Sequence, residues 1–312
     1  MPFSPTNKKP SDFDSYWEHV SDELARTPAA PEIHPIPLRS TDAADCYGVR
    51  LTSIGPYRIF GYLSIPHGPG PFPAIYFLPR YLSVVEVIPQ GDATAKRSRF
   101  VTFSIAVRGQ RNADQPFAAQ FPGLLTEGIT DRASYIFRGI VADCCRGLEY
   151  LLARPEVDRG RVAAVAPNEL PILTAALRPG ITHVVASPAL FYAARDFAPM
   201  ACDYPLEELV DFVRAFPDQS DAAWHTLNYF DPRWFAPLVT SKTLLWADSE
   251  GPPWTREIAL PLAAAFGGPV ELRESRHSRF KDGMFQETWI SGQFGFNEPI
   301  IPNSWKAQVN QE

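Results

Sequence analysis

The order of apolar segments along the chain is the feature that most constrains its fold. Continuous apolar runs, typical of strands covered on both faces, alternate with helical stripes over most of the length. The runs predict strands at 73–78, 100–107, 161–166, 183–186, 243–246 and 270–273, and period-2 alternation predicts another at 57–66. Apolar stripes predict helices at 13–20, 140–153, 170–177 and about 255–266. This alternation favours an α/β fold with a mostly parallel central sheet and helices on both faces.

One stretch, from about 191 to 235, interrupts the alternation. It is rich in aromatic residues, and we expect it to form a cap inserted over the carboxyl ends of the strands, where such sheets place their sites. The remainder contains neither an internal repeat nor a low-complexity linker. Residues 1–312 are therefore predicted to form a single α/β domain that carries this cap.

Composition excludes several classes of protein. The 29 basic and 35 acidic residues give a formal net charge of −6, which argues against a basic surface for nucleic acid. No apolar run reaches the ~20 residues that a membrane-spanning helix needs, and the opening residues lack the apolar segment of a signal peptide. We expect a cytoplasmic protein that binds neither nucleic acid nor membrane.

The cysteines point to buried thiols. Cys46, Cys144, Cys145 and Cys202 show no CxxC spacing, and the adjacent pair lies in a predicted helix. Free thiols are favoured over disulfides or a metal site. Since no other cluster indicates a metal, nucleotide or flavin, no cofactor is predicted.

Five short motifs carry a family resemblance through their order and spacing. They are Val107-Arg-Gly-Gln110, Leu125-Thr-Glu-Gly-Ile-Thr-Asp131, Tyr135-Ile-Phe-Arg138, Pro155-Glu-Val-Asp158 and Thr226-Leu-Asn-Tyr-Phe-Asp231. Together they resemble the acetyl xylan esterase/cephalosporin C deacetylase family of α/β-hydrolases, from about Asp12 to Gly295. The resemblance implies an α/β-hydrolase fold, a pocket for acetyl esters and a tendency to form homo-oligomers.

The nucleophile of this family has no counterpart here. The family places a serine in a Gly-x-Ser-Gln-Gly-Gly turn between a strand and a helix. The same place reads Ala166-Pro-Asn168-Glu-Leu-Pro171, so Asn168 stands where the serine is expected and no glycine remains. An amide can donate hydrogen bonds but is not acylated under ordinary conditions. The resemblance therefore predicts that the serine-esterase mechanism is lost.

Other catalytic parts of the family are matched. Asp248 and His277 fall on the triad aspartate and histidine, and such a pair makes a general base. The alternative is that the two residues only pin a loop. Tyr81 matches the tyrosine that helps to form the oxyanion hole, to which Asn168 would add a donor.

Three charged residues next to these positions are candidates for substrate binding. Arg80 and Arg276 replace glycines of the family pattern and would hold an anionic substrate, although surface ion pairs are the alternative. Glu169 follows the lost nucleophile. Its N–H would point into the oxyanion hole, and its carboxylate would be either solvated or a second acid–base group.

A pocket that keeps a base but lacks a nucleophile favours β-elimination of acetate. His277, oriented by Asp248, would remove a proton from carbon while oxyanion donors stabilise the departing acetate. Such a step is known from tetronate and spirotetronate antibiotic biosynthesis, where a partner acetyltransferase first acetylates the alcohol. The leading hypothesis is thus a lyase that acts on an acetylated, acidic, tetronate-like small molecule. The alternatives are ester hydrolysis by water that His277 activates, and a non-catalytic pseudo-esterase.

Overall fold

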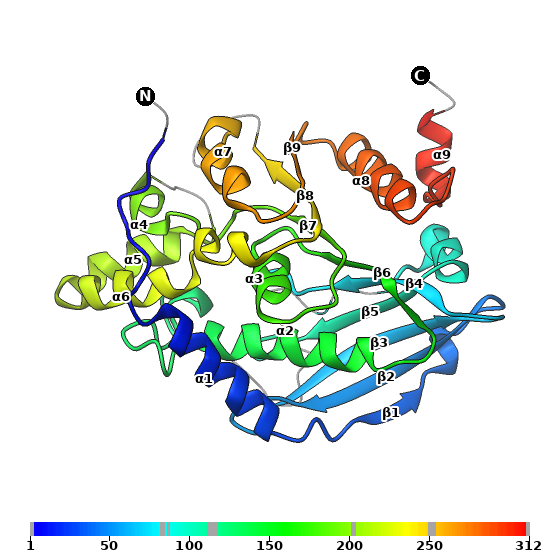
Figure 1. Cartoon of the computed structure of the whole chain (residues 1–312), viewed down its shortest axis with the longest axis horizontal. Coiled ribbons are helices and arrows are strands. Elements are labelled where there is room, and N and C mark those ends of the chain that lie inside the picture. The colour runs from blue at the N-terminus through cyan, green and yellow to red at the C-terminus, as the bar shows by residue number, and fades with distance from the viewer. Residues whose placement is uncertain are drawn as a thin grey trace.

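A single twisted sheet of nine strands forms the centre of the computed structural model, which describes residues 3–81, 85, 88–110, 118–200, 204–248 and 254–309 (Figure 1). The strand order is β1-β2-β3-β5-β4-β6-β7-β8-β9. The strands are β1 Glu32–Pro35, β2 Ala44–Thr52, β3 Arg58–Pro66, β4 Phe72–Phe77, β5 Val101–Ala106, β6 Val157–Val165, β7 His183–Ala186, β8 Lys242–Ala247 and β9 Val270–Glu274.

The sheet is parallel over the part that carries the candidate site. Strands β4 to β9 pair in parallel with their neighbours, whereas β1, β2 and β3 form an antiparallel edge that joins β5. From β4 the chain moves to β5 on one side and returns to β6 on the other. The strand order therefore reverses between β4 and β6, which creates a crevice at their carboxyl ends.

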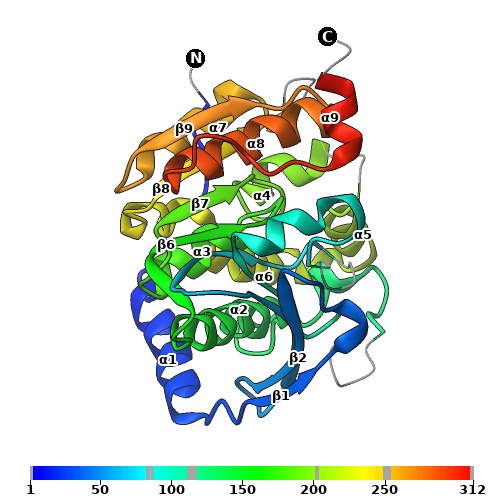
Figure 2. The ribbon, with the colours of Figure 1, turned by 90° about the vertical axis from the view of Figure 1, so that its right-hand side faces the viewer.

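Helices cover both faces of the sheet, as predicted. On one side lie α1 Phe13–Arg26, α2 Ile136–Leu152 and α3 Leu170–Leu177, and on the other lies α8 Arg279–Gln293 (Figures 1 and 2). Alternation along β4 separates the two layers. The Tyr76 hydroxyl donates to the Cys144 carbonyl of α2 at 2.8 Å, whereas Ile75 packs in a cluster with Ile290 of α8.

The segment 191–235 folds into helices between β7 and β8. They are α4 Ala194–Phe197, α5 Glu207–Ala215 and α6 Ser220–Leu227, grouped at one end of the molecule (left in Figure 1). Glu208 of α5 accepts a hydrogen bond from Tyr81, which lies four residues beyond the end of β4. The segment therefore reaches the carboxyl edge of the sheet, while the division of the chain into domains stays a prediction.

The remaining elements are α7 Arg256–Ala265, α9 Asn303–Val309 and several short 3-10 helices, of which η2 Gly91–Ser98 is the longest in the described residues. Each strand and helix predicted from the apolar pattern is present, although some of the ends differ. Within the described ranges, no helix combines the length and apolar character needed to cross a membrane.

The predicted free thiols are confirmed for three cysteines. Cys46, Cys144 and Cys145 are buried and unpaired with sulfur, and Cys202 lies outside the described residues. Burial raises the pKa of the Cys145 thiol to about 12, so this sulfur stays protonated and unreactive at neutral pH.

Candidate active site

Three residues at the carboxyl edge of the sheet follow the chain order of a hydrolase triad. Asn168 lies in the turn between β6 and α3, Asp248 follows β8 and His277 follows β9. Because these strands are parallel, their carboxyl ends meet at the same edge. The order nucleophile, acid and histidine is that of the α/β-hydrolases.

Asp248 and His277 form a hydrogen-bonded pair. The Nε2 atom of His277 lies 2.7 Å from Oδ1 of Asp248, and the two side chains are 45% and 39% exposed. The predicted dyad is thus assembled within reach of solvent. With Nε2–H donating to the carboxylate, Nδ1 is the ring nitrogen that can accept a proton.

The loop that carries His277 is anchored to α8. Ser275 accepts a hydrogen bond from the His277 N–H at 3.1 Å and donates its hydroxyl to Asp282 at 2.8 Å. Asp282 also accepts the Arg276 N–H at 3.0 Å. His277 itself has a φ of +50°, in the left-handed region that is unfavourable for a residue with a Cβ.

Asn168 lies just before the first turn of α3, and both ends of its amide side chain are hydrogen-bonded. It is 2% exposed, its Nδ2 donates to the Pro79 carbonyl at 2.9 Å, and its Oδ1 accepts the Leu170 N–H at 3.0 Å. Positive φ among described non-glycine residues occurs at Ala30, Ala193 and His277, and therefore not at Asn168. The turn consequently lacks the strained backbone that exposes a nucleophile in an elbow.

A small, mainly apolar cavity lies beside Asn168. Its volume is about 10 Å³, room for about one water molecule, and its lining includes Arg80, Tyr81, Phe137, Asn168 and Leu190. The Asn168 amide has a second N–H besides the one that Pro79 accepts. A role as an oxyanion donor would use that second N–H.

Tyr81 connects the edge of the sheet to α5 through its hydroxyl. The hydroxyl donates to Oε2 of Glu208 at 2.5 Å and accepts the Leu125 N–H at 2.6 Å, while its ring stacks on Phe137. Burial, together with the bond to Glu208, raises the pKa of Tyr81, and burial also raises that of Glu208. Because the hydroxyl is occupied by Glu208 and Leu125, the backbone N–H of Tyr81 is the group that would take the predicted oxyanion role.

Glu169 does not face a substrate pocket, and its predicted role there was wrong. The residue is fully buried, and Oε1 accepts the backbone N–H groups of Ala189, Leu190, Phe191 and Tyr192 at 2.9 to 3.2 Å. Burial raises the pKa of this carboxyl, and the four N–H donors oppose that rise. The loop after β7 wraps around the carboxylate, which therefore acts as a structural anchor.

The two arginines lie in different surroundings. Arg80 lines the cavity beside Asn168, and its carbonyl accepts a hydrogen bond from Gln110 at 3.2 Å. Arg276 lines a separate hollow with Arg273 and Lys281 against α8. The structure therefore places Arg80, but not Arg276, at the Asn168 cavity. Asp248 and His277 line neither of these two hollows.

The motif Val107–Gln110 makes hydrogen bonds within the scaffold. The Arg108 guanidinium donates to both carboxylate oxygens of Asp143, at 2.9 and 2.7 Å, and Asp143 is fully buried. Gln110 accepts the Val107 N–H at 3.1 Å. These contacts hold the loop after β5 against α2 and do not reach the dyad's histidine.

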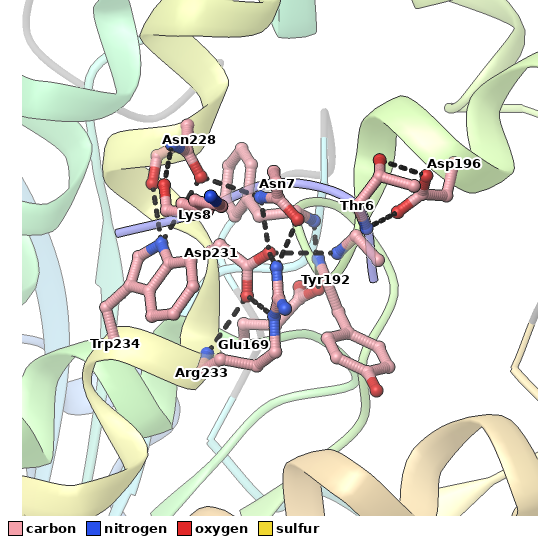
Figure 3. A network of polar contacts seen from close by, with 12 residues as sticks. Thr6, Asn7, Lys8, Glu169, Tyr192, Asp196, Asn228, Asp231, Arg233 and Trp234 are labelled. Atoms are coloured by element: carbon pink, nitrogen blue, oxygen red, sulfur yellow. Dashed lines mark hydrogen bonds and ion pairs between the residues drawn. The ribbon is translucent and has the colours of Figure 1, made fainter. Parts of the chain in front are cut away.

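A polar network between the N-terminal segment and the cap was not foreseen from the sequence. Figure 3 shows Asp231 at its centre, bonded to Arg233 at 2.8 Å and to Asn7 at 3.1 Å. Thr6 donates its N–H and its hydroxyl to Asp196 at 3.0 and 2.5 Å. Nothing in the local sequence around Asn7 indicates partners more than 200 residues away.

The parallel sheet, its flanking helices and the triad-like order of side chains define an α/β-hydrolase fold. The family model described as acetyl xylan esterase (AXE1) matches residues 2–256, and the chain belongs to this family.

Three known proteins similar to this chain are named as acetyl or acetyl xylan esterases. The acetyl esterase Axe7A of Xylanibacter ruminicola is 28% identical over 276 residues, which cover 84% of this chain but only 62% of that relative. Acetyl xylan esterases from Paenibacillus sp. R4 and Thermoanaerobacterium sp. JW/SL YS485 are each 21% identical in structural superposition, with TM-scores of 0.78 and 0.79. The matches cover 93% and 91% of this chain and 96% and 95% of the respective esterases, and they establish the shared fold.

Proposed function

We propose that the protein releases acetate from an acetylated small molecule by base catalysis at His277 and Asp248, without an acyl-enzyme. One observation carries the proposal. His277 and Asp248 are paired at 2.7 Å, whereas Asn168, which we predict to stand at the nucleophile position, has its amide bonded to Pro79 and Leu170.

The backbone of His277 supports a functional dyad over a loop-pinning contact. A left-handed φ of +50° costs a residue with a Cβ roughly 1–2 kcal/mol. A histidine retained in a conformation that glycine adopts more easily indicates that the imidazole serves a purpose beyond folding.

Hydrolysis by activated water is the route that the observations favour most. His277 would take a proton from water through Nδ1, and the resulting hydroxide would attack the acetyl carbonyl carbon. The tetrahedral intermediate would then break its bond to the alcohol oxygen, which leaves with the proton from His277. Asp248 would stabilise the imidazolium during this sequence. Membership of an esterase family supports this order of preference.

Elimination of acetate is the second candidate, and Arg80 is the observation that favours it. In this route His277 removes a proton from the carbon next to the one that carries the acetoxy group. A carbon–carbon double bond forms as the carbon–oxygen bond breaks, and acetate departs. Arg80, which also lines a larger cavity of about 360 Å³ at the carboxyl ends of β4, β6 and β7, would stabilise charge on an acidic substrate. Arg276 and Glu169 do not favour this route, because neither lines the cavity beside Asn168.

The finer assignments remain proposals. An acetylated tetronate-like acid supplied by an acetyltransferase would suit elimination, whereas a neutral acetyl ester would suit hydrolysis. Location in the cytosol and assembly into a homo-oligomer likewise stay predictions.

The two routes are separated by the fate of solvent oxygen. Acetylated neutral alcohols and acetylated hydroxymethyl tetronates are incubated with the protein in ¹⁸O-water, and both products are analysed by mass spectrometry. Labelled acetate beside a free alcohol supports hydrolysis. Unlabelled acetate beside an alkene supports elimination.

Substitutions test the dyad itself. We expect His277→Ala to lower turnover by about 10²–10⁴-fold, whereas His34→Ala, an exposed position on β1, leaves it unchanged. Asn168→Ser is expected not to raise turnover, because the turn does not hold an elbow. Full activity in His277→Ala would show that His277 is not the base, and the absence of turnover by the wild type on all of these esters would favour the non-catalytic alternative. A large gain in Asn168→Ser would show that a serine mechanism is latent.

A further inference from the structure

One part of the buried sheet carries polar side chains where its neighbours are apolar. On the α8 side of the sheet, Ile75 of β4 packs in an apolar cluster. Its register neighbours in the next strands are Thr102 of β5, then Ser64 of β3, then Cys46 of β2. Paired residues point to the same face, and all three are 0% exposed. Two hydroxyls and a thiol therefore continue this row inside the protein.

The element η2 covers these residues with an arginine. It packs on β3 and lies beside α9 (cyan in Figure 1). Arg97, near the end of η2, is 1% exposed, and its Nε donates to the Ser64 hydroxyl at 2.8 Å. Its Nη2 is buried without a hydrogen-bond acceptor among the described residues. A guanidinium stays charged and can only donate, so its burial is costly unless an acceptor, and best an anion, lies against it.

Two more groups beside Arg97 have unused hydrogen-bonding capacity. The hydroxyls of Thr102 and Ser104 are buried and have no partner within the described ranges. Thr102 pairs with Ser64, which Arg97 contacts, and Ser104 lies two residues along β5 on the same face. Hydroxyls can donate as well as accept. Three buried groups that can all donate therefore lie close together between η2 and the sheet.

A second arginine adds positive charge at this place. The Arg39 guanidinium lies 4.7 Å from the centre of the Tyr62 ring, and Tyr62 pairs with Ser104. Burial lowers the pKa of Arg97, and repulsion by Arg39 lowers it further. Over the part of the chain that the structure describes, neither arginine forms an ion pair, and no carboxylate raises the pKa of Arg97.

The carboxylates at η2 have partners of their own. Glu287 of α8 forms an ion pair with Lys96, and the two side chains are only 12% and 11% exposed. Asp92 accepts the Ser304 hydroxyl at 2.6 Å and lies within electrostatic reach of Arg279. These acidic groups therefore compensate other charges than that of Arg97.

We propose that a small monovalent anion of the size of chloride binds between η2 and the sheet, held by Arg97 Nη2 and the hydroxyls of Thr102 and Ser104. A water molecule in the same place would accept hydrogen bonds but leave the positive charge uncompensated, whereas an anion does both. The Nε–Nη2 fork that holds larger oxyanions is not free, because Ser64 occupies Nε. The inference concerns binding alone and is independent of turnover at His277.

Chloride itself is the probe. The melting temperature of the full chain is measured while chloride replaces the bulky anion isethionate at constant ionic strength. We expect a saturable rise, of about 2–4 °C once chloride exceeds its Kd tenfold. In crystals grown with bromide, we expect an anomalous peak within hydrogen-bond distance of Arg97 Nη2.

Substitutions locate the site. Arg97→Gln should abolish the chloride response, whereas Arg159→Gln, exposed on β6, should keep it. Thr102→Val removes one donor, tests the site even if Arg97→Gln does not fold, and should weaken chloride about tenfold. Thr243→Val, buried on β8, should not.

Four results would each overturn the proposal. They are a wild-type melting temperature that does not respond to chloride, a response retained in folded Arg97→Gln, an unchanged chloride affinity in Thr102→Val, and bromide bound only elsewhere.

Discussion

Replacing Glu169 by leucine tests the anchor role that the structure gives this carboxylate. The leucine keeps much of the volume but leaves four buried backbone N–H groups, those of residues 189–192, without their acceptor. Each orphaned donor costs about 1–3 kcal/mol, which gives a gross loss of roughly 4–12 kcal/mol. Removing a buried charge returns several kcal/mol of desolvation energy, and the loop can relax toward water. We therefore expect a net loss of about 3–5 kcal/mol in the free energy of unfolding.

Glu169→Gln is the matched control, because the four N–H groups all converge on one carboxylate oxygen, Oε1. A glutamine carbonyl can take over that oxygen's place. Among the described residues, the second oxygen accepts from Leu190, which already bonds to the first. The glutamine variant should lose only about 1 kcal/mol, the difference between charged and neutral acceptors.

Urea unfolding at pH 7, followed by the fluorescence of the seven tryptophans, measures both losses. A leucine variant within 1 kcal/mol of the wild type would refute the anchor role. A glutamine variant as unstable as the leucine variant would refute the argument that a single oxygen carries the network.

Three further predictions concern stability. Burial lowers the pKa of His183 to about 4. Below pH 6.5 the imidazole therefore binds a proton in the unfolded chain but stays neutral in the folded protein, and the free energy of unfolding should fall by about 1–2 kcal/mol between pH 7.5 and 5. A pH series on His183→Gln should lack that slope. Gly123→Ala places a Cβ 2.2 Å from the carboxyl of Glu208 and should lower the melting temperature, whereas Gly292→Ala, which meets nothing within 4 Å, should not. Asp143→Ala leaves a buried guanidinium unpaired and should cost about 3–5 kcal/mol in urea unfolding; a loss below 1 kcal/mol would contradict the buried pair.

Much of the sheet could be predicted because its central strands are covered on both faces. The run that becomes β4 is apolar throughout and needs no knowledge of its neighbours. By contrast, β1 is exposed at all four positions, so no burial pattern marks it. The helix α8 was missed because its first half lines a cavity with Gly283 and Gln286. Apolar residues that pack on the sheet, such as Ile290, come in its second half.

The positions of the candidate site residues could be predicted from the sequence, but the directions of their side chains could not. Family motifs placed Asn168, Asp248 and His277 at the ends of β6, β8 and β9, and the structure pairs the last two. The directions in which the side chains of Glu169 and Arg276 point depend on partners that are distant in the sequence. The donors to Glu169 come from a loop 20 to 23 residues away, and its wrapping around a carboxylate leaves no local signal.

The N-terminal attachment has a consequence for how the chain is made. The apolar face of α1 meets residues late in the sequence: the Trp17 indole N–H donates to the Tyr229 carbonyl at 3.0 Å, and Phe13 packs on Phe235. At about 5–20 residues per second, a ribosome needs roughly 10–40 s to supply partners 212 residues downstream. During that interval, two large aromatic side chains lack their final cover. Nascent chains stalled before residue 229 should therefore expose α1 to proteases and chaperones, and the completed chain should bury it.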